Sequence, residues 1–218
     1  MKNYSEQAEL SLWFNTIETN SRSISGRSLL FGVGNNDANH MIAAHIDGKR
    51  VEDPAYILWR SVLSRAYSNK TQKEHPTYVG CCMSEEWLSF SNFKPWFIEN
   101  HIDGYNLDKD LKIVGNKVYS SDTCLFVPAW LNCFLSDCRS SRGALPIGVV
   151  KNHNTFRARC NNPKTKRREH LGNFKSEQQA YEAWLLKKLE FAFELKTEMD
   201  IIHKDIYPNI VKMIKDKV

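Results

Sequence analysis

The chain has 218 residues, of which 42% are hydrophobic and 25% are charged, and its formal net charge is +5. A chain of this length and composition buries a sizeable core in one domain or two small ones, which excludes an intrinsically disordered protein. No apolar run reaches the length of a membrane span, and the N-terminus lacks the apolar block of a signal peptide. We therefore expect a cytoplasmic protein with no membrane partner.

The cysteines offer no spacing that is typical of a structural metal site. They are Cys81, Cys82, Cys124, Cys133, Cys138 and Cys160, and no two of them form a CxxC pair. Cysteines of a chain without an export signal are expected to be free thiols. A zinc ion held by four of them is the alternative, which the spacing does not favour.

The first part of the sequence predicts helices around one hairpin. In chain order we expect a polar helix over 1–20, a linker over 21–28, a hairpin or two short strands over 29–51, a helix from Pro54 to Tyr67, a loop over 68–80 and an aromatic-rich helical region capped at Ser84. We assign the aromatic side chains of that last region to the core. A short strand and a helix that starts at Pro128 are expected after them.

The last part of the sequence predicts a small α+β unit. Turn residues over 140–146 mark a domain boundary. After it we expect strands within 147–150, 155–161 and 168–174, a long helix over 175–207 and a last short helix beyond Pro208. Ser176 and Gln179 form a capping box at the start of the long helix. The inner face of this helix is expected to begin with Ala180, Ala183, Trp184 and Lys187.

The basic excess of the chain is concentrated between Lys151 and Lys175. This segment holds eight Lys or Arg residues against Glu169 alone, so it carries +7 and the rest of the chain −2. Such clustering is the electrostatic footprint of a polyanion-binding protein. A solvated basic hairpin without a partner is the alternative.

The stretch NLDKDLKIVGNKVYSSDTC, residues 106–124, places two aspartates on either side of Lys109. Asp108 and Asp110 stand near the start of a turn-rich unit, where carboxylates can hold a divalent metal ion. The alternative is a surface ion-pair cluster that closes a hairpin, with Asn116 supplying the turn conformation after Gly115.

Ordered motifs over roughly residues 30–207 resemble those of a phage and bacterial family of HNH (ββα-metal, His-Me finger) endonucleases with a C-terminal AP2-like DNA-binding domain. The motifs are W-x3-L-x-R-x-Y from Trp59, PTYVGC, EEWLSFSNFKPW, LDKDL, GNKVYSSDTC, FVPAWLN, RGALPIGV, HLGNF and SEQQAYEAW. The resemblance implies an α+β fold, with a ββα-metal-like finger and flanking helices followed by a small three-stranded sheet packed on a long helix. It implies an N-terminal helix and hairpin extension over 1–50, an HNH-like domain over 51–140, and an AP2-like DNA-binding domain with C-terminal helices over 141–218.

The resemblance also assigns roles within the finger. The metal ligands fall on Asp108 and Asn132, whose oxygen atoms suit one Mg²⁺ or Mn²⁺ ion. The middle position of the motif falls on Thr123. A metal ion held there polarises the scissile phosphate and stabilises the leaving oxygen.

The general-base position of the motif falls on Lys109, where the family has a histidine. A lysine is protonated at neutral pH unless it is strongly buried, and neighbouring aspartates favour its charged form. This departure argues against efficient hydrolysis unless Asp110 or His101 takes the proton instead.

The AP2-like domain implies that the sheet enters the major groove of double-stranded DNA. The alternation in TFRARC puts Arg157 and Arg159 on one strand face, where they bracket phosphates or read guanine edges. The KTKRR turn that follows is expected to contact phosphates. The expected DNA-binding residues are Arg157, Arg159, Lys164, Lys166, Arg167, Arg168 and His170.

The sequence therefore favours a phage-encoded, DNA-binding, HNH-like endonuclease that hydrolyses phosphodiester bonds with a divalent metal ion. One alternative is a catalytically inactive DNA-binding protein on the same scaffold, which regulates or occupies a DNA site. Another is a protein-binding inhibitor that uses the aromatic-rich centre.

Overall fold

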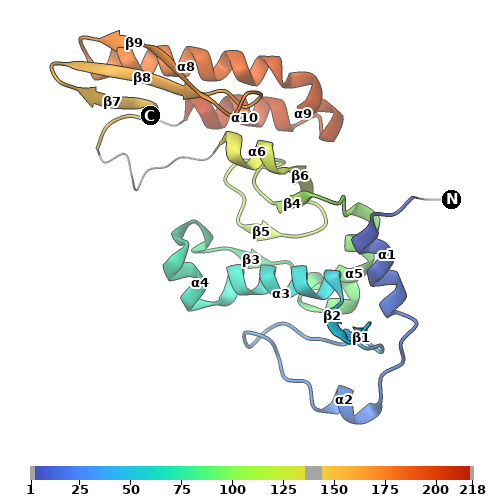
Figure 1. The fold of residues 1–218 in the computed structure, drawn as a ribbon. Coiled ribbons are helices and arrows are strands. Elements are labelled where there is room, and N and C mark those ends of the chain that lie inside the picture. Colours follow the sequence, from blue (N-terminus) through green and yellow to red (C-terminus); the bar gives the residue numbers. More distant parts are fainter. Residues whose placement is uncertain (1–2, 136–143, 217–218) are drawn as a thin grey trace. The chain divides into compact units, whose positions relative to one another are not determined.

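The computed structural model describes residues 3–135 and 144–216, and the chain divides into two compact units (Figure 1). The first unit comprises Met1–Asp110 and Gly115–Phe126, and the second comprises Leu111–Val114 and Val127–Val218. Helices and small sheets are both present, which confirms a mixed α+β fold. Cys138 and residues 140–143 of the expected boundary lie outside the described residues. Within 3–135 and 144–216, no helix is long and apolar enough to cross a membrane.

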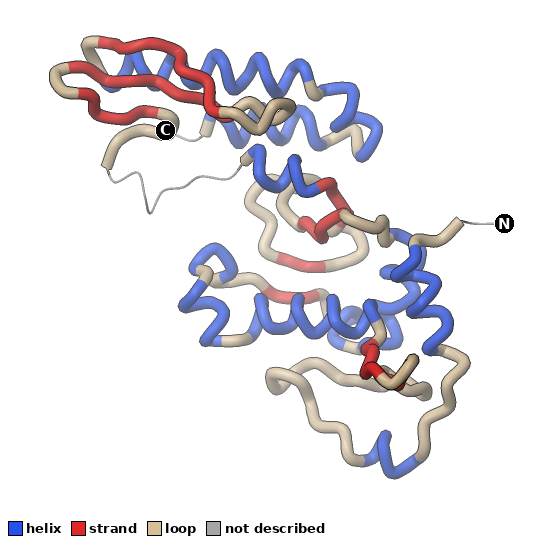
Figure 2. Tube along the Cα trace, in the orientation of Figure 1, coloured by secondary structure: helices blue, strands red, loops and turns tan. Residues whose placement is uncertain are grey.

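The first unit is mainly helical (Figure 2). Its elements are α1 (Glu6–Phe14), α2 (Ser21–Ser25), β1 (Ala43–Ile46), β2 (Lys49–Glu52), α3 (Pro54–Tyr67), α4 (Asn69–Glu74), the 3₁₀ helix η1 (Pro76–Tyr78), β3 (Cys82–Met83), the 3₁₀ helix η2 (Glu86–Leu88), α5 (Phe90–Asn100), β4 (Tyr105–Asp108) and β5 (Val118–Tyr119). Helices α1, α3 and α5 contact one another pairwise and enclose the core.

The aromatic-rich region lies in this core, as expected. Phe90, Phe93 and Trp87 are buried, and the Trp59 indole nitrogen donates a hydrogen bond to the Trp87 carbonyl oxygen at 2.7 Å. This bond satisfies the only polar atom of the Trp59 side chain, so the ring can be fully buried.

The hairpin expected in residues 29–51 forms between β1 and β2, which pair antiparallel. Asp47 and Gly48 make its two-residue turn, with φ angles of 49° and 74°. Positive φ at both central positions is the mark of a type I′ turn, whose twist matches that of the strands.

Several expected bounds in the first unit are wrong. Helix α1 ends at Phe14 instead of Asn20, because the chain then turns to bridge Glu18 with His40. The expected linker contains α2, and the expected loop over 68–80 contains α4 and η1. Ser68 starts α4 by accepting a hydrogen bond from the Thr71 N–H, a capping signal that the polar composition concealed.

The start of the aromatic-rich helix also differs from the expected one. Helix α5 begins at Phe90 with Ser89 at its N-cap, and Ser84 precedes the separate 3₁₀ helix η2. Ser84 therefore does not cap α5.

The strands around residues 106–124 do not pair with their neighbours in sequence. Strand β4 is hydrogen-bonded to β6 (Leu125–Pro128), and β5 pairs in parallel with β3. The turn-rich segment between β4 and β5 therefore connects two sheets instead of closing a hairpin.

The second unit contains the three-stranded sheet that the sequence predicts. Its further elements are α6 (Ala129–Phe134), β7 (Val149–Asn152), β8 (Thr155–Asn161), β9 (Arg168–Phe174), α8 (Glu177–Glu194), α9 (Lys196–Ile202) and α10 (Ile206–Lys215). The strands form an antiparallel sheet in the order β7-β8-β9, and α8 packs along it (Figure 1). Ser176 caps α8 and accepts a hydrogen bond from the Gln179 N–H at 3.2 Å, as expected. Helix α6 also starts after Pro128 as expected.

The expected long helix over 175–207 is divided into α8, α9 and the start of α10. Pro208 lies in the first turn of α10 instead of breaking a helix, and proline is tolerated there because the N–H that it lacks has no partner within the helix. On α8, Lys188 is buried in place of Lys187. Its ammonium donates to the Phe134 carbonyl oxygen at 2.6 Å and lies over the Phe134 ring.

Candidate nucleic-acid interface

One face of the three-stranded sheet presents the predicted arginines. Along β8, Ala158 and Cys160 are buried on the side of α8, and Arg157 and Arg159 alternate with them. Burial raises the pKa of the Cys160 thiol, so this side chain is uncharged in the core.

A bulge in β9 brings the two ends of that strand onto the same face. The pairs across β8 and β9 are Arg157 with Asn173, Arg159 with His170, and Asn161 with Arg168. Leu171 is the extra residue, and Gly172 beside it has a φ of 131°. Because side chains alternate along a strand, His170 and Asn173 share a face only as a result of this extra residue. We call Arg157, Arg159, Arg168 and His170 the basic sheet face.

The single carboxylate of the basic segment points away from the basic sheet face. Glu169 lies opposite the buried Cys160. Its Oε1 accepts a hydrogen bond from Asn162 at 2.6 Å, and its Oε2 lies 3.8 Å from the Lys187 Nζ on α8. The positive charges of the basic sheet face are therefore not offset by this neighbour.

The turn between β8 and β9 carries the other predicted basic residues. The Asn162 side chain holds this turn by accepting hydrogen bonds from the Lys164 and Thr165 N–H groups at 2.9 and 3.1 Å. Lys166 and Arg167 are exposed in it. The Lys164 Nζ lies 3.6 Å from the Glu194 carboxylate of α8, an exposed pair that contributes little and leaves this ammonium accessible.

Part of the expected metal finger is tied together by hydrogen bonds around Lys109. Lys109 is buried, and its Nζ donates to the Asp110 carboxylate at 2.6 Å and to the Asn116 carbonyl oxygen at 3.0 Å. The Asp108 carboxylate accepts from the Asp110 N–H at 2.8 Å, and the Asn116 amide donates to the Lys109 carbonyl oxygen at 2.8 Å. The ion pair of the alternative thus forms between Lys109 and Asp110, and Asn116 follows Gly115 in the turn. Lys109 is buried, however, and the segment closes no hairpin between β4 and β5.

The loop fits a divalent cation poorly. The Lys109 ammonium occupies the position beside Asp110 that a metal ion would need, and the two charges offset one another. In the described parts of the chain, no group of three or more His, Cys, Asp or Glu side chains is placed to hold a metal ion. Asp108 ends β4, and Asn132 lies on α6.

Two further candidates for the finger chemistry have structural contacts of their own. The Thr123 hydroxyl donates to the Val118 carbonyl oxygen at 2.7 Å and accepts from the Ser120 N–H at 3.1 Å, which fixes the turn before β6. The His101 ring packs against Phe126, and its Nδ1 lies 2.7 Å from the Ser5 hydroxyl. Burial lowers the pKa of His101, although the Asp103 carboxylate opposes this shift.

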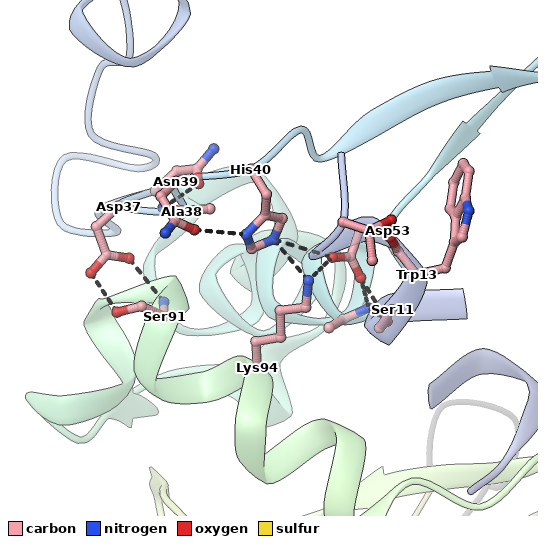
Figure 3. Close-up of polar contacts among 12 residues, drawn as sticks. Ser11, Trp13, Asp37, Ala38, Asn39, His40, Asp53, Ser91 and Lys94 are labelled. Carbon is pink, nitrogen blue, oxygen red and sulfur yellow. Dashed lines mark hydrogen bonds and ion pairs between the residues drawn. The ribbon is translucent and has the colours of Figure 1, made fainter. Parts of the chain in front are cut away.

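Sequence reasoning missed a buried polar cluster in the first unit, which Figure 3 shows. The Asp53 carboxylate, fully buried, accepts hydrogen bonds from the Ser11 hydroxyl at 2.6 Å and from the Ala55 N–H at 2.9 Å. Its other oxygen lies 2.8 Å from the Lys94 Nζ, which is itself 2.8 Å from the His40 Nε2. The cluster thus joins α1, the N-terminus of α3 and α5.

The sequence contained a signal for the burial of Lys94. This residue follows Phe90 by four positions and precedes Phe97 by three, so it belongs to the same apolar helix face. Burial is the main reason that the pKa of Lys94 is lowered, and the Asp53 carboxylate opposes that shift. Burial and the Lys94 charge lower the pKa of His40, which favours the neutral ring that accepts the Lys94 hydrogen bond.

Comparison of the chain with protein-family models, with curated proteins and with solved structures finds no match.

Proposed function

We propose that this protein binds double-stranded DNA through the basic sheet face of its second unit. The observation that carries the proposal is the gathering of Arg157, Arg159, Arg168 and His170 on one side of a sheet whose other side packs on α8. The major groove of DNA admits a β-ribbon, and guanidinium groups pair with phosphates and with guanine edges. Lys166 and Arg167 extend the same charge into the turn beside the sheet.

The test is the affinity for a labelled duplex, measured by fluorescence anisotropy over a range of salt concentrations. We expect the logarithm of the binding constant to fall linearly with the logarithm of the salt concentration, with a slope of about −0.9 for each phosphate contact. The double variant Arg157→Gln/Arg159→Gln should bind more weakly and with a shallower slope. Lys187→Gln is the control, because it removes a charge from α8 on the other side of the sheet.

Two results count against DNA binding by this face. One is a lack of measurable affinity at low salt. The other is an affinity of the double variant equal to that of Lys187→Gln, which would move the binding surface elsewhere.

Endonuclease activity is a second proposal, which rests on the resemblance of the sequence motifs. It is supported by the hydrogen bonding of β4 to β6 and by α6, which follows β6 directly; β5 lies between the two strands in the chain and pairs elsewhere. The Lys109 ammonium weighs against efficient turnover, because a group that already donates to two oxygens is a poor acceptor for a proton from water. The inactive DNA-binding protein is therefore the form of the proposal that we favour.

A supercoiled plasmid incubated with Mg²⁺, Mn²⁺ or EDTA separates the two forms. Retarded but unbroken plasmid in every lane is expected of a DNA-binding protein without turnover. Nicking that requires the metal ion and is lost in Asp108→Ala would instead establish an endonuclease. The alternative of a protein-binding inhibitor requires that the aromatic-rich centre be accessible to a partner. Trp87, Phe90 and Phe93 of this region are buried in the core, so they do not form such a surface.

A further inference from the structure

A pocket of about 500 Å³ opens on the first unit, apart from the loop and the buried cluster described above. One face of α3 forms the floor of the pocket. The rest of the lining is Thr71 of α4, His75 and Tyr78 at η1, and Phe31 in the turn between Leu30 and Gly34. A volume of this size is typical of sites for small organic ligands.

The floor of the pocket is basic and rich in hydroxyl groups. Arg60 and Arg65 of α3 both line it. The Arg60 guanidinium lies 3.0 Å from the Glu52 carboxylate. The Arg65 side chain is hydrogen-bonded to Tyr119, which is uncharged, so this bond leaves the positive charge of Arg65 without a counter-charge. The Ser64 and Thr71 hydroxyls also line the pocket and lie 2.8 Å apart. Arginine with hydroxyl donors is the combination that binds phosphate groups.

Two aromatic rings border the same pocket. The Arg65 guanidinium lies over the Tyr78 ring, 5.7 Å from its centroid, so this ring and the charge face the same space. The second ring is that of Phe31, which is 42% exposed although it is a large apolar side chain. A planar ligand ring can stack on such side chains.

The backbone of Phe31 supports a role in ligand contact. Its φ is 52°, a conformation that is rare and strained for an aromatic residue. Reciprocal backbone hydrogen bonds of 2.8 Å between Leu30 and Gly34 hold the turn that imposes it. The turn thus keeps an apolar ring at the edge of a basic pocket instead of in the core.

We propose that this pocket binds a nucleoside monophosphate, either free or as the 5′-phosphorylated end of a DNA strand. The phosphate lies on Arg65 and Arg60, with the hydroxyls of Ser64 and Thr71 as further donors, and the base stacks on Phe31 and Tyr78. This site is separate from the basic sheet face, so the inference does not rest on DNA binding by that face.

Isothermal titration calorimetry of the full chain at low salt tests the proposal, with the four nucleoside 5′-monophosphates, the nucleosides and inorganic phosphate as probes. We expect binding of the monophosphates, with the nucleosides and inorganic phosphate each weaker by about tenfold or more, because each lacks one of the two recognised parts. No heat from any monophosphate would overturn the proposal. Inorganic phosphate that binds as tightly as the nucleotides would also overturn it, because the rings would then contribute nothing.

Three variants locate the binding. Arg60→Gln removes one guanidinium from the pocket, and Arg50→Gln is its matched control, because Arg50 pairs with the other oxygen of the same Glu52 carboxylate without lining the pocket. Phe31→Gly removes a ring at a position where glycine relieves backbone strain, so its fold should be unharmed. Arg60→Gln and Phe31→Gly should each weaken the monophosphate by about fivefold or more, whereas Arg50→Gln should not. If all three variants bound the monophosphate with the same affinity, the ligand would not bind in this pocket and the proposal would be overturned.

Short single strands with and without a 5′-phosphate separate the two sources of the nucleotide. They are compared in the Arg157→Gln/Arg159→Gln background, so that binding by the sheet contributes little. Tighter binding of the phosphorylated strand, lost on Arg60→Gln, identifies a strand end as the ligand. Monophosphate binding with no preference between the strands identifies the free nucleotide.

Discussion

Lys94 and Asp53 form an ion pair in the core of the first unit, with the Lys94 Nζ 2.8 Å from the Asp53 Oδ2 and side chains that are 4% and 0% exposed. Lys94→Met leaves a buried carboxylate without its counter-charge, and we expect the free energy of unfolding to fall by about 3–5 kcal/mol. Urea unfolding followed by the fluorescence of the buried tryptophans measures this loss. Adding Asp53→Asn to Lys94→Met should restore part of it, because asparagine keeps the hydrogen bond that caps α3.

The control for this pair is Arg50→Gln, which breaks an exposed pair with Glu52. We expect that change to cost less than about 1 kcal/mol. A loss in Lys94→Met no larger than in Arg50→Gln would mean that the pair contributes only packing.

The buried histidines predict a loss of stability in acid. Burial lowers the pKa of His40, with the Lys94 charge adding to the shift, and burial also lowers the pKa of His101. Below about pH 6.5 the unfolded state therefore binds more protons than the folded state. The free energy of unfolding should fall as the pH decreases below this value, by at most about 1.4 kcal/mol per pH unit for each histidine, and level off below the folded pKa values.

Urea midpoints measured between pH 7.5 and pH 5 check this dependence. His40→Gln should flatten the curve, and the same change at the exposed His45 serves as the control. A curve of the wild-type protein that is flat across this range would show that neither ring titrates with folding.

The basic sheet face and the turn beside it should affect DNA binding in different ways. Lys166→Gln or Arg167→Gln should weaken all sequences alike and make the salt slope shallower by about 0.9, as expected of phosphate contacts. Arg159→Gln should also reduce the preference among duplexes, by about 1–3 kcal/mol at the base pair that it reads. Competition between duplexes of different sequence measures the difference. If Arg159→Gln weakened binding to all duplexes equally, as the turn variants do, the sheet would contact phosphates and would not read base pairs.

Gly148 allows the close approach of α8 to the sheet. Its φ is 79°, and a Cβ there would lie 2.1 Å from the Trp184 ring. Gly148→Ala should therefore lower the free energy of unfolding by about 2 kcal/mol or more, through both backbone strain and overlap. Gly115→Ala, at a φ of 76° with no atom within 4 Å of the added Cβ, isolates the backbone part and should cost about 1 kcal/mol. Equal losses measured by urea unfolding would mean that Trp184 shifts at little cost.

The sequence predicted the three-stranded sheet and the start of α8 because the signals for both are local. Alternation along Thr155–Asn161 placed Arg157 and Arg159 on one face, and Ser176 marked the start of α8. The division of the long helix was missed because the residues around Leu195 and His203 lack a strong breaker. The sequence did not predict the pairing of β4 with β6. Tertiary contacts determine which strand pairs with β4, and the local sequence pattern carries no information about them.

The candidate sites depended even more on tertiary structure. The sequence placed Lys109 beside two aspartates, yet only the structure joins its ammonium to the Asn116 carbonyl oxygen. The pocket over α3 draws Phe31 and Tyr78 from segments about thirty residues and about fifteen residues away from its arginines, a spacing that no local pattern links.

The bulge in β9 makes the charge of this surface depend on the register of the strand as well as on its composition. Deleting Leu171 would keep the present pairs, because His170 would then stand next to Gly172 in a regular ladder. If the bulge were lost with Leu171 retained and paired with Arg159, Arg168 and His170 would turn toward α8 and Glu169 toward solvent. The same amino acids would then display an acid where they now display bases. The charge that this face displays therefore depends on the bulge that accommodates Leu171, and not on the residue types of β9 alone.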